Sequence, residues 1–395
     1  MQVLNPALQT YPWGSKTLLA QLRGLDVPSA TPQAELWFGA HPASPATIGE
    51  TGLDQVIAAD PAAALGAEVQ AEFGDELPFL LKILAADAPL SIQAHPTAEQ
   101  ARAGFAAENE AGIALESPER NYKDPHHKPE LLIALTPFTA LAGLRPAHQT
   151  LEFFAYLDCP ELDRFADMLR SEDEEEGLRA LFTTWISLPR TKRVEVIEGV
   201  RAAVEKRSFD GTPDWMRAAA ECFVHVDEAY PGDVGVLASL LLNYVQLAPG
   251  EALYLGAGRL HAYVSGMAVE VMANSDNVLR GGLTTKHVDV PELVRVTDFS
   301  SQIDPRVTAE IRGSAHDFNV PARDFTLTRY ELGSGESFTA DCAGPAIVLC
   351  TAGEIDGGGV SLSSGTAAWI PAADPAVEIT AHDAGAEVFY VRVGA

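Results

Sequence analysis

Gln93 and His95 stand two positions apart in the run "LSIQAHP", where an apolar stretch ends at Pro96. If this run is a β-strand, both side chains leave the same face, because strand side chains alternate with a period of two. An amide oxygen and an imidazole nitrogen on one face are ligands that a divalent metal ion accepts. Packing alone gives no strong reason for this pair, so the spacing indicates a metal site.

Two residues further along the chain offer matching ligand atoms. Glu130 follows Pro129 at the start of the apolar segment "ELLIAL", and His261 follows the glycine-rich turn "LGAGRL". Imidazole nitrogen and carboxylate oxygen are typical zinc ligands, and catalytic zinc sites keep one position open for water or substrate. Each residue taken alone is more often structural, and the spacing does not show that these positions converge.

The elements that must position these residues are mostly strands. Short apolar runs separated by Gly and Pro dominate the first 90 residues and predict several short strands joined by loops. Thr97 and Gln100 then form a capping-box pattern, which predicts a helix through "AEQARAGFAAENEAG". From about residue 148 to 230, apolar residues recur at spacings of three and four, which predicts a helical domain. Its acidic run "SEDEEEG" is interpreted as a solvated loop or a helix start.

Strand patterns return after this helical segment. Asp233 is predicted to cap one more helix, over about 233–242, before β-like sequence resumes. From about 318 onward, strand-like runs recur at intervals typical of an all-β domain: "FTLTRYEL", "PAIVLCTAGEI", "GTAAWIPA", "AVEIT" and "AEVFYVRV". The chain is therefore predicted to be mainly β, with an inserted all-α domain.

The bulk composition excludes several classes of protein. A chain of 395 residues with 47% hydrophobic residues predicts two or three globular domains. The net charge of −28 argues against nucleic acid and anionic membranes as partners. We find no signal-peptide pattern at the start, and the longest apolar stretch is too short to span a membrane. The four cysteines form no CxxC pair, which favours a reducing, cytoplasmic compartment; Cys342 and Cys350 are interpreted as buried free thiols and not as a bridge.

Three motifs carry a resemblance to a known family. They are "IQAHPT", "NYKDPHHKPELLIALTPFTALAGLRP" and "GRLHAYVSGMAVEVMANSDNVLRGGLTTKHVDVPEL". With "YPWGS" and "ELWFGAHP" near the start, this sequence closely resembles type I phosphomannose isomerase (mannose-6-phosphate isomerase), of the cupin superfamily. The match keeps the same order over roughly residues 10 to 300. The helical segment and the region after 318 match only in general character.

The resemblance implies a fold and a metal centre. The family fold is a cupin (jelly-roll) barrel with an inserted helical domain and a C-terminal β domain. This implies a discontinuous catalytic cupin domain over 1–147 and 231–317, a helical insert over 148–230 and a cupin-like β domain over 318–395. One Zn²⁺ ion per chain is implied, held by Gln93, His95, Glu130 and His261.

The resemblance also implies a reaction, the interconversion of mannose 6-phosphate and fructose 6-phosphate through ring opening and a cis-enediol. Arg280 is implied as the cation that stabilises the enediolate, because a guanidinium stays protonated at any working pH. Glu270 is assigned by analogy as the proton-transfer base, and Asp276 as a group that assists ring opening. The alternatives are a surface-facing strand carboxylate for Glu270 and a turn-forming residue for Asp276.

Cations are required to bind the substrate phosphate. The resemblance implies Ser91 and Lys82 as phosphate-site residues, and Lys128 and Lys286 are further cationic candidates. Lys128 has the alternative role of tuning a neighbouring acid or delivering a proton. Each lysine alone fits a solvated surface position, but Lys128 and Lys286 fall inside matched motifs, and Lys82 lies within the matched region, of a very acidic chain.

Two other functions compete with the isomerase. An iron oxygenase on the same barrel usually uses two histidines and one carboxylate, and the additional Gln93 argues against it. A non-catalytic metal-containing cupin that binds sugar phosphate is expected to lose Arg280, Glu270 or a ligand, and all are present. The chain is therefore expected to act as a cytoplasmic monomer on a small-molecule sugar phosphate.

Overall fold

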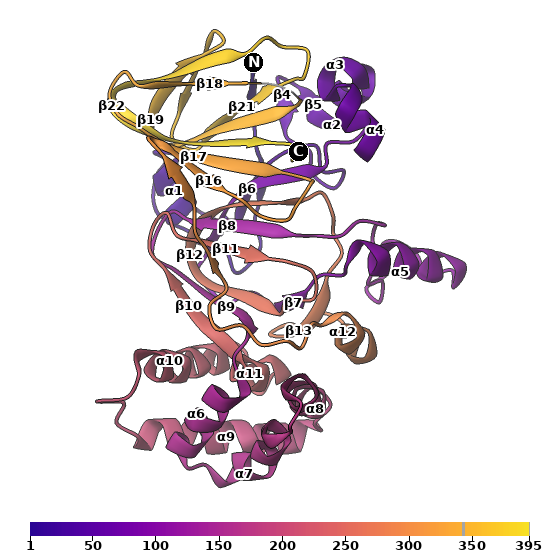
Figure 1. Cartoon of the computed structure of the whole chain (residues 1–395), viewed down its shortest axis with the longest axis vertical. Coiled ribbons are helices and arrows are strands. Elements are labelled where there is room, and N and C mark those ends of the chain that lie inside the picture. Colours follow the sequence, from indigo (N-terminus) through magenta and orange to yellow (C-terminus); the bar gives the residue numbers. More distant parts are fainter. Residues whose placement is uncertain (342–343, 395) are drawn as a thin grey trace.

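The protein is described by a computed structural model that covers residues 1–341 and 344–394. Figure 1 shows three regions along the longest axis: C-terminal strands at one end, a barrel of strands in the middle and a group of helices at the other end. The antiparallel sheets and the helical segment between them confirm the predicted mainly β class with inserted helices.

The barrel holds the residues that could do chemistry. Within the described residues, eleven strands form its sheet. They are β2 (Ala7–Gln9), β3 (Glu35–Phe38), β6 (Phe79–Ala86), β7 (Ile92–Ala94), β8 (Glu130–Ala134), β9 (Phe138–Leu144), β10 (Leu242–Leu247), β11 (Ala252–Leu255), β12 (His261–Ala273), β13 (Leu279–Gly282) and β14 (Arg306–Val307). A separate short hairpin joins β4 (Thr47–Ile48) to β5 (Thr51–Gly52).

Strand β12 joins the two halves of the barrel. Its first residues pair with β9 and β7, whereas its residues from Gly266 onward pair with β6 and β8. Gly266 lies at the change of partner with φ of 112°, where an added Cβ would lie 2.6 Å from the Pro137 carbonyl oxygen. Only glycine adopts this conformation without strain. The residue type therefore fixes where β12 passes from one half of the barrel to the other.

The barrel interior changes from apolar to polar along β12. At one level Ala268 lies opposite Leu84 and Ala134, within a buried apolar cluster. Two residues further on the same face, Glu270 lies opposite Lys82. The next inward position, Met272, lies opposite Glu130. The apolar end therefore closes the barrel, and the other end carries the charges.

The helices between β9 and β10 pack on one another around a large apolar core. Their bounds are α6 (Ala147–Leu157), α7 (Pro160–Ala166), the 3₁₀ helix η1 (Asp167–Arg170), α8 (Glu174–Ile186), α9 (Arg190–Lys206), α10 (Asp214–Ala229) and α11 (Val234–Ser239). The acidic run proves to be a helix start, because Asp173 caps α8 and the following glutamates occupy its first turn. Asp233 caps α11 as predicted, but the helix is shorter than 233–242 because β10 begins at Leu242.

Other helices flank the barrel. The predicted capping box of Thr97 and Gln100 is present at the start of α5 (Ala98–Glu110). The prediction of only strands and loops in the first 90 residues was incomplete, since helices α1 to α4 lie there. Their bounds are α1 (Leu18–Leu22), α2 (Leu53–Ala59), α3 (Pro61–Leu65) and α4 (Ala67–Phe73), and α12 (Val290–Val296) follows β13. Each of α1 to α4 has five to seven residues, too short for a helical period to show in the sequence.

The C-terminal strands form a second sheet. Its nine strands, counted over the described ranges, are β1 (Gln2–Leu4), β15 (Glu310–Arg312), β16 (Ala315–Phe318), β17 (Thr326–Leu332), β18 (Ser337–Ala340), β19 (Ala346–Gly357), β20 (Val360–Ser363), β21 (Thr366–Ile370) and β22 (Val377–Arg392). Strand pairing thus places β1, β15 and most of β16 with the C-terminal sheet, ahead of the boundary predicted at 318. Two predicted strands, "AVEIT" and "AEVFYVRV", are continuous in β22.

Two predictions from the sequence, the buried free cysteines and the lack of a membrane-spanning stretch, can be compared with the structure. Cys159, Cys222 and Cys350 are buried free thiols, and Cys342 lies outside the described residues. Across the described part of the chain, the helices are all too short or too polar to cross a membrane.

Candidate metal centre and active site

Three of the predicted ligands meet inside the barrel. His95, which follows β7, lies with its Nε2 atom 3.2 Å from Oε1 of Glu130, the first residue of β8. His261, the first residue of β12, places its Nε2 atom 3.2 Å from Oε2 of the same carboxylate. Ligand atoms of the three side chains all lie within 4.8 Å of one another, and all three residues are buried.

The hydrogen bonds of the two imidazoles fix which nitrogen faces the carboxylate. Nδ1 of His95 lies 2.8 Å from the carbonyl oxygen of Asn277, and Nδ1 of His261 lies 2.9 Å from that of Arg259. A carbonyl only accepts, so each Nδ1 carries the proton and each neutral ring turns an Nε2 lone pair toward Glu130. Burial lowers the pKa of His95 to about 4, which keeps its ring neutral.

This donor set fits a divalent metal ion. His95 Nε2 and Glu130 Oε2 are buried polar atoms that find no hydrogen-bond partner in the described part of the chain. Burial raises the pKa of Glu130, but His95, Lys128 and His261 outweigh it and hold that pKa well below its usual range. Two lone pairs and an ionised carboxylate converging in a buried site repel one another unless a cation lies between them.

Gln93 lies in the same row as these ligands. Its Cα pairs with that of His261 across β7 and β12, and with that of Arg280 across β7 and β13. Residues directly opposite on neighbouring strands project from the same face, so the three side chains share one face of the sheet. Gln93 also lines the adjoining cavity. Its role as a fourth ligand stays a prediction.

Glu270 is a buried carboxylate held by two donors. The Tyr263 hydroxyl donates to its Oε1 at 2.6 Å, and Nζ of Lys82 lies 3.3 Å from its Oε2. Burial raises the pKa of Glu270 above its ordinary value, although Lys82 opposes the shift. The predicted alternative of a surface-facing strand carboxylate is wrong, because the residue is 2% exposed.

Lys82 is shared between two acids. Besides Glu270, it lies 3.8 Å from Oε1 of Glu35, whose other oxygen accepts a hydrogen bond from the Trp37 indole at 2.7 Å. Burial lowers the pKa of Lys82, but the two carboxylates outweigh it and raise that pKa overall. Lys82 therefore remains charged, with its charge balanced locally.

A cavity of about 660 Å³ opens beside the cluster. This volume is in the range of small-molecule sites. Most of the predicted catalytic and phosphate-site residues line it: Lys82, Ser91, Lys128, Asp276, Arg280 and Lys286. Aromatic residues form another part of the wall, namely Tyr11, Trp13, Trp37 and Tyr230.

Arg280 and Lys286 stand out because the described residues supply neither with a carboxylate partner within ion-pair distance. Burial lowers the pKa of Arg280; burial and the charge of Arg280 together lower that of Lys286. Two neighbouring cations without an acid form an attractive site for an anion, all the more so in a chain with a net charge of −28. Lys128, by contrast, lies 3.6 Å from Oε1 of Glu130.

Asp276 lies at the cavity wall in the loop between β12 and β13. Its Oδ1 is 3.4 Å from Nε2 of His41, and its backbone N–H donates to Asp124. His41 accepts the Ala43 N–H at Nδ1, so its proton is on Nε2 and points at Asp276. Burial raises the pKa of Asp276, but His41, Lys128 and Lys82 outweigh it and lower that pKa overall. The carboxylate is thus ionised and faces the cavity.

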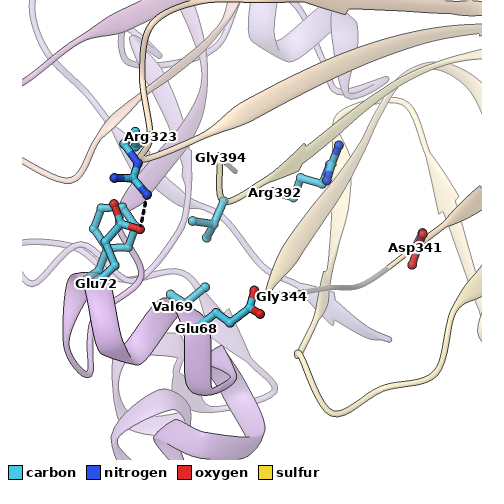
Figure 2. A pocket seen from close by; sticks show the side chains of 10 residues that line it. Glu68, Val69, Glu72, Arg323, Asp341, Gly344, Arg392 and Gly394 are labelled. Atoms are coloured by element: carbon cyan, nitrogen blue, oxygen red, sulfur yellow. Dashed lines mark hydrogen bonds and ion pairs between the residues drawn. The ribbon is translucent and has the colours of Figure 1, made fainter.

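A second pocket, of about 200 Å³, lies between α4 and the end of β22 (Figure 2). Arg323 and Arg392 line it together with three acids, Glu68, Glu72 and Asp341. Nη2 of Arg323 pairs with Oε2 of Glu72 at 2.9 Å across the pocket. Because acids outnumber cations there, this pocket does not favour an anionic ligand.

Several residues of the site were missed by the sequence interpretation. Tyr263 bonds Glu270, Glu35 bonds Lys82, and His41 faces Asp276. Tyr263 had a signal, because it lies two positions after His261 and so shares its strand face. Glu35 and His41 lie inside "ELWFGAHP", but nothing in their spacing points to partners more than 40 residues away.

Comparison with known proteins agrees with this geometry. The family description "Phosphomannose isomerase type I, catalytic domain" matches residues 1–147. A mannose-6-phosphate isomerase of Escherichia coli (strain K12) is 38% identical over 400 residues, covering 98% of this chain and 99% of that protein. The Homo sapiens mannose-6-phosphate isomerase is 33% identical over 354 residues, covering 83% and 81%.

Solved structures give the same result for the fold. A crystal structure of mannose 6-phosphate isomerase bound with zinc and yttrium has a TM-score of 0.89 and 36% identity, and covers 100% of both chains. A zinc-bound holo structure has a TM-score of 0.90 and 37% identity, covering 100% of this chain and 99% of that one. The predicted cupin fold with inserted helices is confirmed. This chain belongs to the type I phosphomannose isomerase family.

Proposed function

We propose that this protein is a zinc-dependent aldose–ketose isomerase that interconverts mannose 6-phosphate and fructose 6-phosphate. The main support is that the buried cluster of His95, Glu130 and His261 lies beside a cavity lined by Arg280 and Lys286, two cations that have no ion-pair partner among the described residues. The domain division into 1–147 with 231–317, 148–230 and 318–395 is part of the same proposal.

The metal centre would be formed by His95, Glu130 and His261, with Gln93 as the fourth ligand. One Zn²⁺ per chain, when bound, supplies a Lewis acid for the negative charge that develops on the substrate oxygens. The chain itself fixes the ligands, since both imidazoles are oriented by backbone carbonyls.

The sugar ring must open before any proton leaves carbon. Asp276 is an ionised carboxylate at the cavity wall, so it can accept the proton of the anomeric hydroxyl. The Nε2–H of His41 orients that carboxylate. The C1–O5 bond then breaks and the proton held by Asp276 passes to O5, which leaves C1 of mannose 6-phosphate as the aldehyde.

A proton then moves from C2 to C1 through a cis-enediol. Glu270 is our candidate base: it takes the C2 proton and returns it to C1, while the hydroxyl proton of O2 passes to O1, so that C1 becomes a hydroxymethyl group and C2 a ketone. Lys82 and Tyr263 hold its carboxylate in place. Arg280 opposes the enediolate charge, because its guanidinium remains protonated throughout.

The phosphate dianion needs cations and hydrogen-bond donors at the far side of the cavity. Lys286 is the strongest candidate because it faces the cavity without a carboxylate partner among the described residues. Ser91 supplies a hydroxyl donor, and Lys82 and Lys128 add positive charge although both also contact acids.

A coupled assay for fructose 6-phosphate tests the proposal. The protein is expected to convert mannose 6-phosphate, and Glu270→Gln is expected to lower kcat by about 10²- to 10⁴-fold, the usual contribution of a general base. A non-catalytic sugar-phosphate binder would bind mannose 6-phosphate in calorimetry yet form no product. That result would contradict the proposed isomerase activity and favour a non-catalytic sugar-phosphate binder.

Partners and location follow the same proposal. The partner is a small-molecule sugar phosphate in carbohydrate metabolism, with neither nucleic acid nor membrane as a ligand, because the net charge is −28. We place the protein in the cytoplasm on its free buried thiols. It is proposed to act as a monomer, for which light scattering should give the chain mass of 42.1 kDa.

A further inference from the structure

A long irregular segment runs from the end of α5 to the start of β8, and it carries charges to the active site. Residues 111–129 contain no helix or strand, although the structure describes all of them. Lys128 near its end lies 3.6 Å from Oε1 of Glu130 and lines the active-site cavity. A segment without regular hydrogen bonding needs other contacts to hold such charges in place.

The side chain of Asn277 supplies these contacts. Its Oδ1 accepts the N–H groups of Lys123 and Asp124 at 2.7 and 3.3 Å. Its Nδ2 donates to the carbonyl oxygens of Asp124 and His126 at 2.7 and 2.8 Å. The residue is 0% exposed, so water cannot replace any of these bonds.

The carboxylate of Asp124, in the irregular segment, accepts hydrogen bonds from the loop that contains Asn277. It accepts the Ser275 hydroxyl and the Asp276 N–H, each at 2.8 Å, and the Asn277 Nδ2 at 3.1 Å. An amide on one segment and a carboxylate on the other therefore bind reciprocally. We call this pair of residues the 124/277 clamp.

The same residue also orients a metal ligand. The carbonyl oxygen of Asn277 lies 2.8 Å from Nδ1 of His95 and fixes the tautomer that turns Nε2 toward Glu130. The Asn277 backbone is held by its own side chain and by Ser275, whose hydroxyl accepts the Asn277 N–H at 3.1 Å. Any shift of the clamp therefore moves the carbonyl that orients His95.

We propose that Asn277 is a positioning residue that couples the metal ligand His95 to the segment 121–128, so that metal affinity and the placement of Lys128 in the cavity depend on each other. Removing the amide frees the carbonyl that orients His95, and a displaced His95 loosens the clamp. The inference rests on the proposed function only for the identity of the metal and the substrate.

Metal affinity of Asn277→Ala tests the coupling. Zinc binding is measured by competition with a chelator, and the ligand geometry by the visible absorption of the Co²⁺-substituted protein. We expect zinc to bind about 10- to 100-fold more weakly, as for losses in the groups that orient a ligand, and the cobalt bands to shift. Hydrogen exchange of residues 121–128 should quicken in the same variant, and more so without metal.

Asn121→Ala is the matched control. Asn121 is an asparagine of the same segment, but its Nδ2 bonds Asp289 at 2.9 Å, at the start of α12 and away from His95. Its bond to Asp289 lies outside the clamp, so its loss should quicken hydrogen exchange near residue 121 only, while residues 123–126 stay protected and zinc affinity stays within about twofold of the wild type. Equal weakening by the two variants would contradict the coupling through Asn277.

Asp124→Asn provides a second test of the clamp in case the Asn277→Ala variant does not fold. It keeps the shape of the clamp but places an amide donor against one of the two donors that bond its separate oxygens, either the Ser275 hydroxyl or the Asp276 N–H, so it should weaken zinc binding in the same direction. If both clamp variants keep wild-type zinc affinity and cobalt spectrum, the inference is overturned. If wild-type protein binds zinc but forms no fructose 6-phosphate, the proposed function fails while the coupling remains testable by affinity alone.

Discussion

Single residues of the cavity differ in whether their charge is already balanced. Lys82 lies between Glu35 and Glu270 and stays charged, so its charge mainly serves the two carboxylates. Arg280 and Lys286 lack such acids within the described ranges, so an incoming dianion meets cations that have not been neutralised. Phosphate affinity should therefore depend more on Lys286 than on Lys82.

Lys286→Gln should raise the KM for mannose 6-phosphate by about 10- to 100-fold, because a charge-assisted hydrogen bond contributes about 1.5–3 kcal/mol. Steady-state kinetics should show kcat within about threefold of the wild type, since uniform binding is lost. Lys192→Gln, which removes a surface lysine paired with Glu195 on α9, is the control and should change neither constant. An unaltered KM in Lys286→Gln would remove this residue from the phosphate site.

Tyr263→Phe should move the acidic limb of the kcat profile to higher pH. A base must be ionised, so activity is lost as the pH falls through the pKa of Glu270. The Tyr263 hydroxyl donates to the carboxylate and opposes the burial that raises this pKa. Without the hydroxyl the pKa rises further, and a pH series of kcat measures the shift. Tyr244→Phe, whose hydroxyl contacts Gln246 outside the cavity, should leave the limb in place; a common shift would refute the assignment.

The sequence predicts a residue when its signal is local. Gln93 and His95 became ligand candidates from their spacing on one strand, and Glu130 and His261 from their position at strand starts, but only the family resemblance joined the four into one predicted site. The residues that orient them were not found, because their bonds join distant segments: Asn277 meets Lys123 across 154 positions, and His41 faces Asp276. A polar residue in a loop has too many local uses for a distant partner to be inferred from it.

At the scale of elements, β12 determines the geometry of the site. It carries His261 at its start and Glu270 near its end, and Gly266 turns the strand between them. The turn lets one strand contribute to both halves of the barrel. The distance between the metal ligands and the proposed base therefore depends on this one glycine.

Gly266→Ala should lower the free energy of unfolding by about 2–4 kcal/mol, because the added Cβ meets the Pro137 carbonyl at 2.6 Å and φ is 112°. Zinc affinity should fall as well. Gly313→Ala is the matched control: its φ is also positive, at 63°, but an added Cβ meets nothing within 4 Å. It should cost about 1 kcal/mol and leave zinc binding unchanged. Denaturant midpoints that agree for the two variants would contradict the role of Gly266.

Elements were predicted well where the chain marks their ends. The capping box of α5 and the cap at Asp233 appear in the structure as expected, and the acidic run is one of its two predicted alternatives, a helix start. Helices α1 to α4 were missed because one or two turns show no period, and their formation depends on packing against the barrel and the C-terminal sheet. The convergence of His95, Glu130 and His261 depends on the register of β12 with β7 and β8, which no local pattern specifies.

At the scale of the whole molecule, metal binding and folding are linked. The three ligands are spread over more than 160 residues of the sequence, from His95 to His261, so an unfolded chain cannot present them together. Anything that binds only the folded state stabilises it, by about 2.7 kcal/mol at a ligand concentration of 100 Kd.

Zinc should therefore raise the midpoint of thermal unfolding of the metal-depleted protein in a concentration-dependent way, as followed by circular dichroism. Mg²⁺ at the same concentration is the control and should have little effect, because two imidazoles suit zinc and not magnesium. Equal stabilisation by the two ions would indicate a general ionic effect on a chain with a net charge of −28, and not a specific site.

The most direct test of the account is a zinc titration of the metal-depleted protein, followed by the rate at which mannose 6-phosphate becomes fructose 6-phosphate. The account predicts that chelation abolishes this rate and that it returns in proportion to added zinc, reaching its full value at one ion per chain. Full activity in a sample shown by elemental analysis to hold no metal would contradict it.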